Sequence, residues 1–242
     1  MSLFDDALDE LVTANHILAR EGVVDSFGHI SIRHPENPDH YLLSRSRAPE
    51  CIEVIDIMEF TLEGEPVDPK GRDPYAERAI HGSVYKARPE VNSVVHNHSL
   101  NVIPFGVTGT DLKPLFHMAA GMGSDVPIWD SRKNFGDTTL LVTTMEMGLD
   151  LTDMLADNRA ALMRGHGCVV VGKSVREVVF SSIYLEVNAE LQFKATTLGD
   201  ITFLSGGEVD AILKRRGPYT FERAWERWCG RAGRPYAPAP EP

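Results

Sequence analysis

Residues 91–99 read VNSVVHNHS, an apolar β-strand that turns polar at its carboxyl end. Side chains two residues apart on a strand point to the same face, so we expect His96 and His98 to lie side by side. A third histidine, His166, stands in the distant stretch RGHGC, between two glycines that allow a close approach of the backbone. Two imidazoles on one face and a third from elsewhere suit a divalent metal that keeps a coordination position open. These stretches therefore predict a metal centre at the end of a core strand.

An acidic residue precedes this strand and can complete the site. Glu77 is expected on a helix over residues 74–88, which begins with one proline and ends before another. The predicted ligands are then His96, His98, His166 and Glu77. This set has no thiolate, so we expect one Zn²⁺ per subunit, with Mn²⁺, Co²⁺ or Fe²⁺ as alternatives. His81 shares the expected helix face with Glu77 and is either a supporting partner or a packed histidine.

The composition excludes several classes of function. A chain of 242 residues with 43% apolar and 24% charged residues is typical of a soluble protein with one core. A net charge of −11 argues against nucleic-acid binding, which needs a basic face. The three cysteines form no paired motif, the acidic first residues are unlike a signal peptide, and no apolar run is long enough to span a membrane. We therefore expect a cytoplasmic enzyme without membrane or nucleic-acid partners.

The pattern along the chain alternates helices with strands, most of which are linked as hairpins. We expect helices over 3–21, 74–88, 146–157 and 174–198, and strands over 28–33, 41–44, 54–60, 91–97, 126–129, 160–163 and 168–171. A capping box, SVRE, opens the last helix, and a second box, SGGE at 205–208, is weakened by its glycines. This pattern favours a single α/β domain over residues 1–230, with helices on the faces of a mixed or antiparallel sheet. Residues 231–242 are expected to be a disordered tail.

Five ordered motifs carry a resemblance to a known family. They are GHIS at 28–31, Glu77 with His81, RPEV at 88–91, HNHS at 96–99 and RGHG at 164–167. Together they resemble the class II aldolase/adducin family over residues 5 to about 200. The resemblance implies a three-layer α/β/α sandwich around a mixed, largely antiparallel sheet, and a homo-oligomer, commonly a tetramer, with active sites near subunit contacts. It also implies that the three histidines bind the metal and that Glu77 is an acid/base that can touch it.

The sequence departs from the sugar-phosphate aldolases of this family where they bind phosphate. Those enzymes show Gly-Asn, Thr-Gly or Ser-Gly, and Ser-Ser at places that here read Gly28-His29, Ser44-Arg45 and Tyr75-Ala76. A phosphate cradle needs backbone N–H groups and small hydroxyl residues, whereas a guanidinium fork, as on Arg45 and Arg47, matches a carboxylate. The epimerases of the family carry an aspartate two residues after a mid-chain histidine, and the stretch His117-Met118-Ala119 lacks it. Epimerase activity is therefore disfavoured.

These substitutions look like the decarboxylase branch of the family, which acts on hydroxylated aromatic dicarboxylates. We expect a carboxy-lyase of aromatic compound catabolism that acts on an anionic aromatic small molecule. The favoured substrate is 3,4-dihydroxyphthalate, and 3-hydroxy-2-methylpyridine-4,5-dicarboxylate is a close second. Glu77 is the first candidate for the acid that protonates the ring carbon, and His29 or His117 is the second. The expected substrate-binding residues are His29, Ser44, Arg45, Arg47 and Tyr75. The two arginines could instead form a solvated turn, and His117 could be structural.

Two other functions stay open at this point. A metal-dependent retro-aldolase (an aldehyde-lyase) acting on a hydroxy carbonyl acid or a sugar phosphate would use the same three histidines and Glu77 to stabilise an enediolate. Inorganic phosphate should then compete at the site. A metal-free interaction module, as in the adducin branch, would carry no metal, so elemental analysis separates it from both enzymes.

Overall fold

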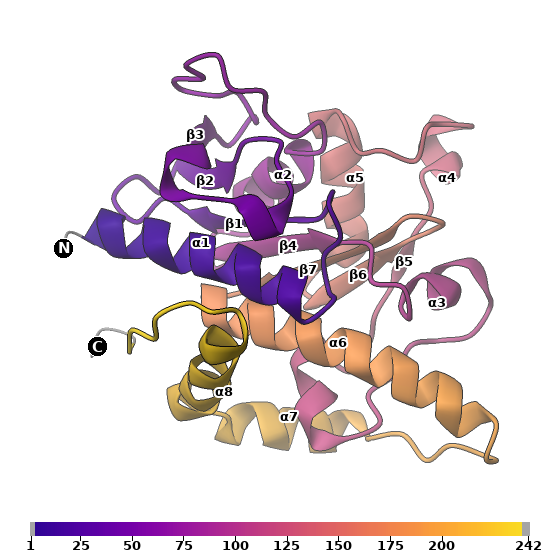
Figure 1. Ribbon diagram of the computed structural model, residues 1–242. Helices are drawn as coiled ribbons and strands as arrows, with labels where there is room; N and C mark the ends of the chain where they lie inside the picture. The colour runs from indigo at the N-terminus through magenta and orange to yellow at the C-terminus, as the bar shows by residue number, and fades with distance from the viewer. Residues whose placement is uncertain (1–2, 239–242) are drawn as a thin grey trace.

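The computed structural model describes residues 3–238 and is built around one sheet (Figure 1). The strands are β1 (His29–Arg33), β2 (His40–Ser44), β3 (Ile57–Thr61), β4 (Ser93–Asn97), β5 (Ile128–Trp129), β6 (Ala160–Met163) and β7 (Gly167–Gly172). They lie in the order β3-β2-β1-β4-β7-β6-β5. Neighbouring strands are antiparallel except β5 and β6, which are parallel. The sheet is therefore mixed and largely antiparallel, which confirms the prediction.

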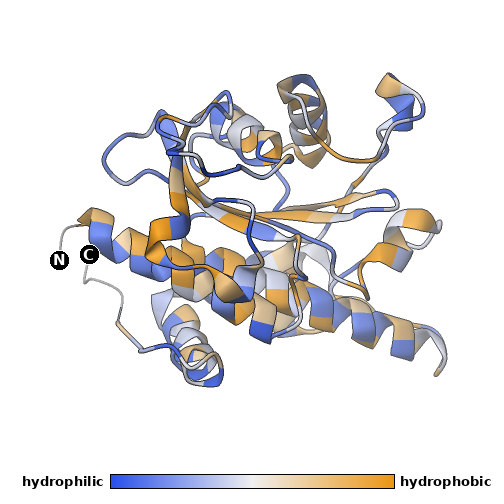
Figure 2. Ribbon diagram, turned by 45° about the horizontal axis from the view of Figure 1, so that its top comes forward, coloured by the Kyte–Doolittle hydropathy of each residue, from blue (hydrophilic) through white to orange (hydrophobic). Residues whose placement is uncertain are grey.

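Helices cover both faces of the sheet and give three layers (Figure 2). On one face lie α1 (Leu3–Arg20), α6 (Val175–Thr196) and α8 (Pro218–Arg231), and on the other lie α2 (Ala79–Ala87) and α5 (Met145–Leu155). The shorter elements are α3 (Ile103–Val107), α4 (Arg132–Phe135), α7 (Gly206–Arg215) and the 3₁₀ turns η1 (Pro49–Cys51), η2 (Val54–Asp56) and η3 (His117–Met122). The three-layer α/β/α sandwich is confirmed.

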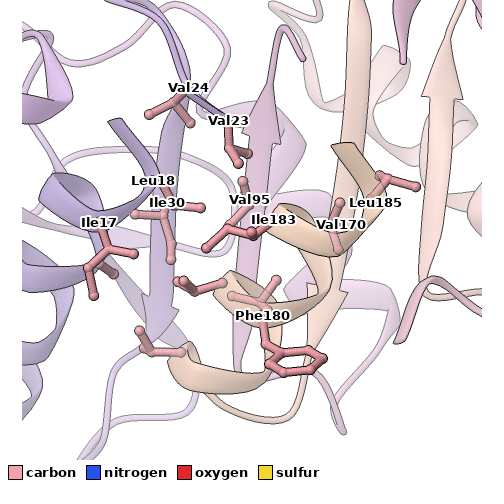
Figure 3. Close-up of a cluster of buried hydrophobic side chains, with 14 of the residues drawn as sticks. Ile17, Leu18, Val23, Val24, Ile30, Val95, Val170, Phe180, Ile183 and Leu185 are labelled. Carbon is pink, nitrogen blue, oxygen red and sulfur yellow. The ribbon is translucent and has the colours of Figure 1, made fainter. Parts of the chain in front are cut away.

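The alternation of side chains along β4 divides the interior into two cores. Val95 packs with Ile30 and Val170 against the helices α1 and α6 (Figure 3). Val94 belongs to the second core, on the side of α2 and α5. Each such buried aliphatic side chain contributes about 1.5–3 kcal/mol, so both faces of the strand are firmly held. Since side chains repeat every two residues, His96 follows Val94 on the α2 side.

Most expected elements agree with the structure within a few residues. Both expected N-caps are present, but the box at Ser174 is only half formed, because the Glu177 carboxylate accepts the Lys173 N–H and not that of Ser174. The Ser174 hydroxyl accepts a hydrogen bond from the Glu177 N–H at the start of α6. At the start of α7 the capping box is complete in spite of its glycines, because Ser205 and Glu208 each accept the other's backbone N–H. The short helices α3 and α4 and the C-terminal helix α8 were not predicted.

The expected helix over residues 74–88 is wrong at its beginning, because α2 starts only at Ala79. Pro74 forms an antiparallel bridge with Arg45, and the Asp73 carbonyl accepts the Ser46 N–H at 2.8 Å. These contacts hold the segment extended next to the end of β2, so it cannot adopt helical dihedrals there. Glu77 therefore lies in the turn before α2 and not on the helix.

Part of the expected tail contacts the domain. Arg231 is the last residue of α8, the Arg234 N–H donates to the Cys229 carbonyl, and the Arg176 guanidinium donates to the Ala237 carbonyl. Residues 239–242 of that prediction lie outside the described residues. Within residues 3–238, none of the helices has the length and apolar character that crossing a membrane would require.

Candidate metal centre

Glu77, His96, His98 and His166 meet at one point, as predicted, with all four ligand atoms within 4.8 Å of one another. Nε2 of His98 lies 3.2 Å from Nε2 of His96 and 3.1 Å from Nε2 of His166. Oε2 of Glu77 lies 3.6 Å from Nε2 of His96 and 3.4 Å from Nε2 of His166. A tetrahedron around zinc with its usual bond lengths has edges of about 3.3 Å, which these four separations match, while the other pairs of ligand atoms lie within 4.8 Å of each other.

Two features of the chain bring the histidines together. His96 is in β4, and His98 follows one residue after that strand ends at Asn97. His166 lies in the tight turn between β6 and β7, and β7 pairs with β4. A Cβ on Gly167 would lie 2.0 Å from the Asn97 carbonyl oxygen, so only glycine allows this approach. The close contact that the flanking glycines predicted is confirmed at Gly167.

An oxygen atom holds Nδ1 of each of the three histidines that could bind the metal. The acceptors are the Cys168 carbonyl for His96 at 3.1 Å, the Leu140 carbonyl for His166 at 3.0 Å and the Asp25 carboxylate for His98 at 3.1 Å. Carbonyl and carboxylate oxygens only accept, so Nδ1 carries the hydrogen and the lone pair of Nε2 faces the centre.

Asp25 was missed by the sequence analysis, although it holds both a ligand and the chain before β1. Its Oδ2 binds His98, and its Oδ1 accepts the N–H groups of Phe27 and Gly28 at 2.9 and 3.0 Å. The only signal in the sequence is an acidic residue in the turn DSFG, a pattern that is common in ordinary turns.

The donor set fits a divalent cation. Burial raises the pKa of Glu77, but the adjacent imidazoles of His166 and His96 outweigh it and hold that pKa well below its usual value. Glu77 is therefore ionised, and its Oε1 accepts the Val142 N–H at 2.9 Å. Three imidazole lone pairs and a carboxylate oxygen converging in a largely buried space repel one another unless a cation lies between them. Nitrogen and oxygen ligands without a thiolate suit Zn²⁺, Mn²⁺, Co²⁺ or Fe²⁺.

The structure brings His29 and Tyr75 to this centre. His29 is paired with His96 across β1 and β4, and the two rings are 5.1 Å apart between centroids. The Tyr75 ring lies 4.5 Å from that of His29. The Tyr75 hydroxyl donates to the Arg47 carbonyl, which fixes the ring at the start of the Arg45–Arg47 loop. His81 is hydrogen-bonded to His29 at 2.7 Å and does not belong to the metal-ligand cluster.

Both imidazoles of this pair are neutral. Burial is the main cause, and it lowers the pKa of His81 to about 3 and that of His29 well below its usual value.

The two arginines share a buried carboxylate that the sequence analysis missed. Arg45 Nε and Arg47 Nη1 donate to the two oxygens of Asp56 at 2.5 and 2.6 Å. Burial opposes ionisation of Asp56, but these hydrogen bonds and the Glu53 N–H hold its pKa below the usual value. Two guanidinium groups and one carboxylate leave one net positive charge. The arginine side chains are 39% and 35% exposed, so they can still meet a ligand.

Two other predicted residues differ in their positions. Ser44 is buried at the end of β2, directly before Arg45. His117 is exposed at the start of η3, which packs on α6 and α7, and its carbonyl accepts a hydrogen bond from Arg216 at 2.8 Å. No contact among the described residues joins the His117 ring to the four metal-ligand residues, so a single protomer does not bring it to the centre.

Comparisons with known proteins agree with this geometry. The family described as Class II Aldolase and Adducin N-terminal domain matches residues 9–193. The chain is 35% identical to Decarboxylase tropJ from Talaromyces stipitatus, over 90% of each protein. It is 26% identical to a 3,4-dihydroxyphthalate decarboxylase from Arthrobacter keyseri, over 93% of each. The solved L-fuculose 1-phosphate aldolase from Glaciozyma antarctica PI12 superposes with a TM-score of 0.73 at 24% identity, over 96% of this chain and 93% of that one. The extent of the family match and the identity to tropJ establish that this chain belongs to the class II aldolase/adducin family.

Proposed function

We propose that the protein is a metal-dependent carboxy-lyase that removes CO₂ from a hydroxylated aromatic dicarboxylate. The favoured substrate is 3,4-dihydroxyphthalate, with 3-hydroxy-2-methylpyridine-4,5-dicarboxylate as the second candidate. The observation that carries the proposal is a three-histidine, one-glutamate centre next to an aromatic pair, whose Tyr75 contacts the loop that carries Arg45 and Arg47. The similarity to two proteins named as decarboxylases supports the same reaction.

The neighbours of the centre suit a flat aromatic anion better than a phosphate. The His29 and Tyr75 rings pack at 4.5 Å between centroids with their planes tilted by 42°, and both are buried, so they form a firm aromatic wall beside His96. A phosphate would need small residues there so that backbone N–H groups could reach its oxygens. A planar ring can instead lie against the wall, where offset or edge contacts between aromatic groups are favourable.

Arg45 and Arg47 are proposed to hold the carboxylate that remains on the ring. Each uses one nitrogen on Asp56, which orients the guanidinium group while other N–H donors stay available. The net positive charge of the cluster attracts a dianionic substrate to an otherwise acidic protein. Holding this carboxylate would fix which of the two carboxylates is cleaved.

Glu77 is proposed to move the proton. Because it is ionised in the structure, it first accepts the proton of the substrate's ring hydroxyl. The bond from the ring to the carboxylate then breaks, CO₂ leaves, and the electron pair stays on the ring carbon. Glu77 returns its proton to that carbon, and water supplies a proton to the ring oxygen when the product leaves. A divalent cation bound by the four ligands would act as a Lewis acid on the substrate oxygens, and zinc is the metal we propose.

We also propose that the protein is a homo-oligomer, with a tetramer as the expected form. Apolar side chains next to the centre are exposed: Phe27 at 70%, Leu100 at 78%, Val107 at 55% and Leu141 at 40%. Such residues beside a functional site favour a contact between subunits. Light scattering coupled to size-exclusion chromatography tests the assembly, and a monomer at micromolar concentration would contradict it.

The experiment that tests the reaction follows two products in parallel. Zinc-loaded protein is incubated with both dicarboxylates and with a panel of sugar phosphates, and CO₂ and aldehyde are measured. We expect CO₂ from a dicarboxylate, no aldehyde and no competition by inorganic phosphate. Aldehyde release from a sugar phosphate would instead show a retro-aldolase. Protein that holds no metal and releases neither product would point to an interaction module.

A matched pair of variants tests the role of Glu77. Glu77→Gln should keep zinc on the three histidines and lose most turnover, by about 10²–10⁴-fold, since its amide cannot carry a proton. Glu63→Gln, which alters an exposed carboxylate paired with Lys86, is the control and should behave as wild type. Full activity of Glu77→Gln would refute this role.

A further inference from the structure

A chain of hydrogen bonds runs from His29 into the core below the metal centre. Nδ1 of His29 lies 2.7 Å from Nε2 of His81. Nδ1 of His81 lies 2.6 Å from the Ser31 hydroxyl, and that hydroxyl lies 2.7 Å from the hydroxyl of Tyr85. All four side chains are at most 1% exposed, so water has little access to any link.

The repeats of a strand and a helix produce this chain. His29 and Ser31 are two residues apart on β1, so their side chains share one face of the sheet. His81 and Tyr85 are four residues apart on α2, so they lie on one side of that helix. The packing of α2 on this face of the sheet places the two pairs opposite each other. Polar groups in such a buried place are costly unless each one is satisfied, and here they satisfy one another.

Counting hydrogens limits the arrangements. The two hydroxyl groups and the two neutral imidazoles supply four hydrogens, and the chain has three links. When each link contains one hydrogen, one hydrogen remains, and it must lie at an end of the chain. It is either on Nε2 of His29, whose ring lies next to that of His96, or on the Tyr85 hydroxyl, pointing away from Ser31.

The surroundings of Tyr85 decide between the two ends. Among the described residues, the Tyr85 hydroxyl forms a hydrogen bond only with the Ser31 hydroxyl. A phenol hydrogen that pointed away from Ser31 would be buried without an acceptor, which is costly. The phenol hydrogen therefore binds Ser31. The Ser31 hydrogen then binds His81, and the Nε2 hydrogen of His81 binds His29.

We propose that Tyr85, Ser31 and His81 are positioning residues that hold His29 in its Nε2–H tautomer, so that His29 presents a fixed hydrogen-bond donor to the ligand at the metal centre. No described residue hydrogen-bonds to this Nε2, although the His29 side chain is almost fully buried. An anionic oxygen on the bound molecule would accept a hydrogen bond from this Nε2–H group. That this oxygen belongs to the substrate's carboxylate or ring hydroxyl rests on the proposed function.

The chain also limits what His29 can do in the reaction. To give its Nε2 hydrogen to carbon, His29 would have to take a hydrogen from His81, and the shift would end with a phenolate on Tyr85. Burial disfavours a phenolate there, and the Ser31 hydroxyl is the one hydrogen-bond partner of the phenol among the described residues. His29 therefore binds and orients the ligand, and proton transfer is left to Glu77.

The tautomer can be measured without any turnover. In zinc-loaded protein labelled with ¹⁵N-histidine, a neutral imidazole gives distinct nitrogen shifts for its protonated and unprotonated atoms. The protein has nine histidines, and the signals of His29 are those that disappear in the His29→Gln variant. We expect wild-type His29 to be a single Nε2–H tautomer, and an Nδ1–H tautomer would overturn the proposal.

Removing the end of the chain tests the positioning role. Tyr85→Phe leaves three hydrogens for two links, so His29 should become a mixture of both tautomers. The control is Tyr41→Phe. The Tyr41 ring is also buried and lies 5.5 Å from the Tyr85 ring between centroids, but its hydroxyl donates to the Arg78 carbonyl and does not belong to the hydrogen-bond chain. His29 in that variant should keep the wild-type tautomer. An unchanged tautomer in Tyr85→Phe would refute the role, and Ser31→Ala repeats the test if Tyr85→Phe does not fold.

Ligand affinity provides the second readout. If half of His29 carries the donor, the apparent Kd or KM of a carboxylate ligand should rise about two-fold in Tyr85→Phe, while kcat changes less. Should the protein prove inactive on aromatic dicarboxylates, the tautomer result still stands, so the two proposals fail separately. A pure Nε2–H tautomer together with a lower kcat at unchanged KM in Tyr85→Phe would contradict an orienting role.

Discussion

The hydrogen bond from His98 to Asp25 predicts a defined loss of metal affinity in Asp25→Asn. In the wild type the carboxylate accepts the Nδ1 hydrogen of His98 at 3.1 Å, and its other oxygen accepts the N–H groups of Phe27 and Gly28. The asparagine side chain has one acceptor oxygen for these two roles. If that oxygen keeps the backbone contacts, the amide N–H₂ faces His98 and favours the tautomer with a hydrogen on Nε2, which cannot bind metal. If the amide turns by 180°, its N–H₂ group faces the backbone N–H groups of Phe27 and Gly28, which are also donors.

The size of the effect follows from the exposure of Asp25. Loss of such an outer partner costs about 10–100-fold in metal affinity, or about 1.4–2.8 kcal/mol. The Asp25 side chain is 49% exposed, so water can replace part of the lost hydrogen bond. We therefore expect the lower end of this range, a zinc affinity about ten-fold weaker than that of the wild type. The affinity is measured by competition with a chromophoric chelator. Asp39→Asn, in another exposed turn, is the control. Zinc binding by Asp25→Asn within about two-fold of both wild type and control would show that Asp25 does not support the ligand.

Three further predictions concern the metal site and the fold. His96→Ala should lose stoichiometric zinc in elemental analysis, and a variant that retained it would remove His96 from the ligands. Gly167→Ala should lower the free energy of unfolding, measured by urea titration, by about 1–3 kcal/mol or more, because its Cβ would lie 2.0 Å from a carbonyl oxygen. The control is Gly230→Ala in α8, where a Cβ would have no atom within 4 Å; it should raise the free energy of unfolding by about 0.5–1 kcal/mol. Burial raises the pKa of Glu186 in the folded protein above its value of about 4.3 in the unfolded chain. The stability that comes from the protonated form is therefore present below about pH 4.3 and is lost as the pH rises through the pKa of Glu186 in the folded protein. Glu186→Gln should therefore have a higher urea midpoint than wild type at pH 7, and an advantage that persisted at pH 3 would contradict this cause.

Features that depend on local repeats were predictable from the sequence. The apolar run that ends in His96 predicted a core strand with polar groups at its end, because alternation along a strand is a local property. The caps at Ser174 and Ser205 were predictable for the same reason, since a cap involves residues three apart. The start of α2 was not, because the contact of Pro74 with Arg45, which is distant in sequence, holds the segment before α2 extended.

The sequence by itself determined the ligand types, the family and the layered α/β architecture, because these depend on residue identity, spacing and periodicity. Only the tertiary structure decided what lies behind the ligands. Asp25 meets His98 from 73 residues away, and the chain from His29 to Tyr85 needs β1 and α2 packed face to face. Hydrogen bonds act over about 3 Å and depend on direction, so no pattern along the chain can specify which distant groups will form them.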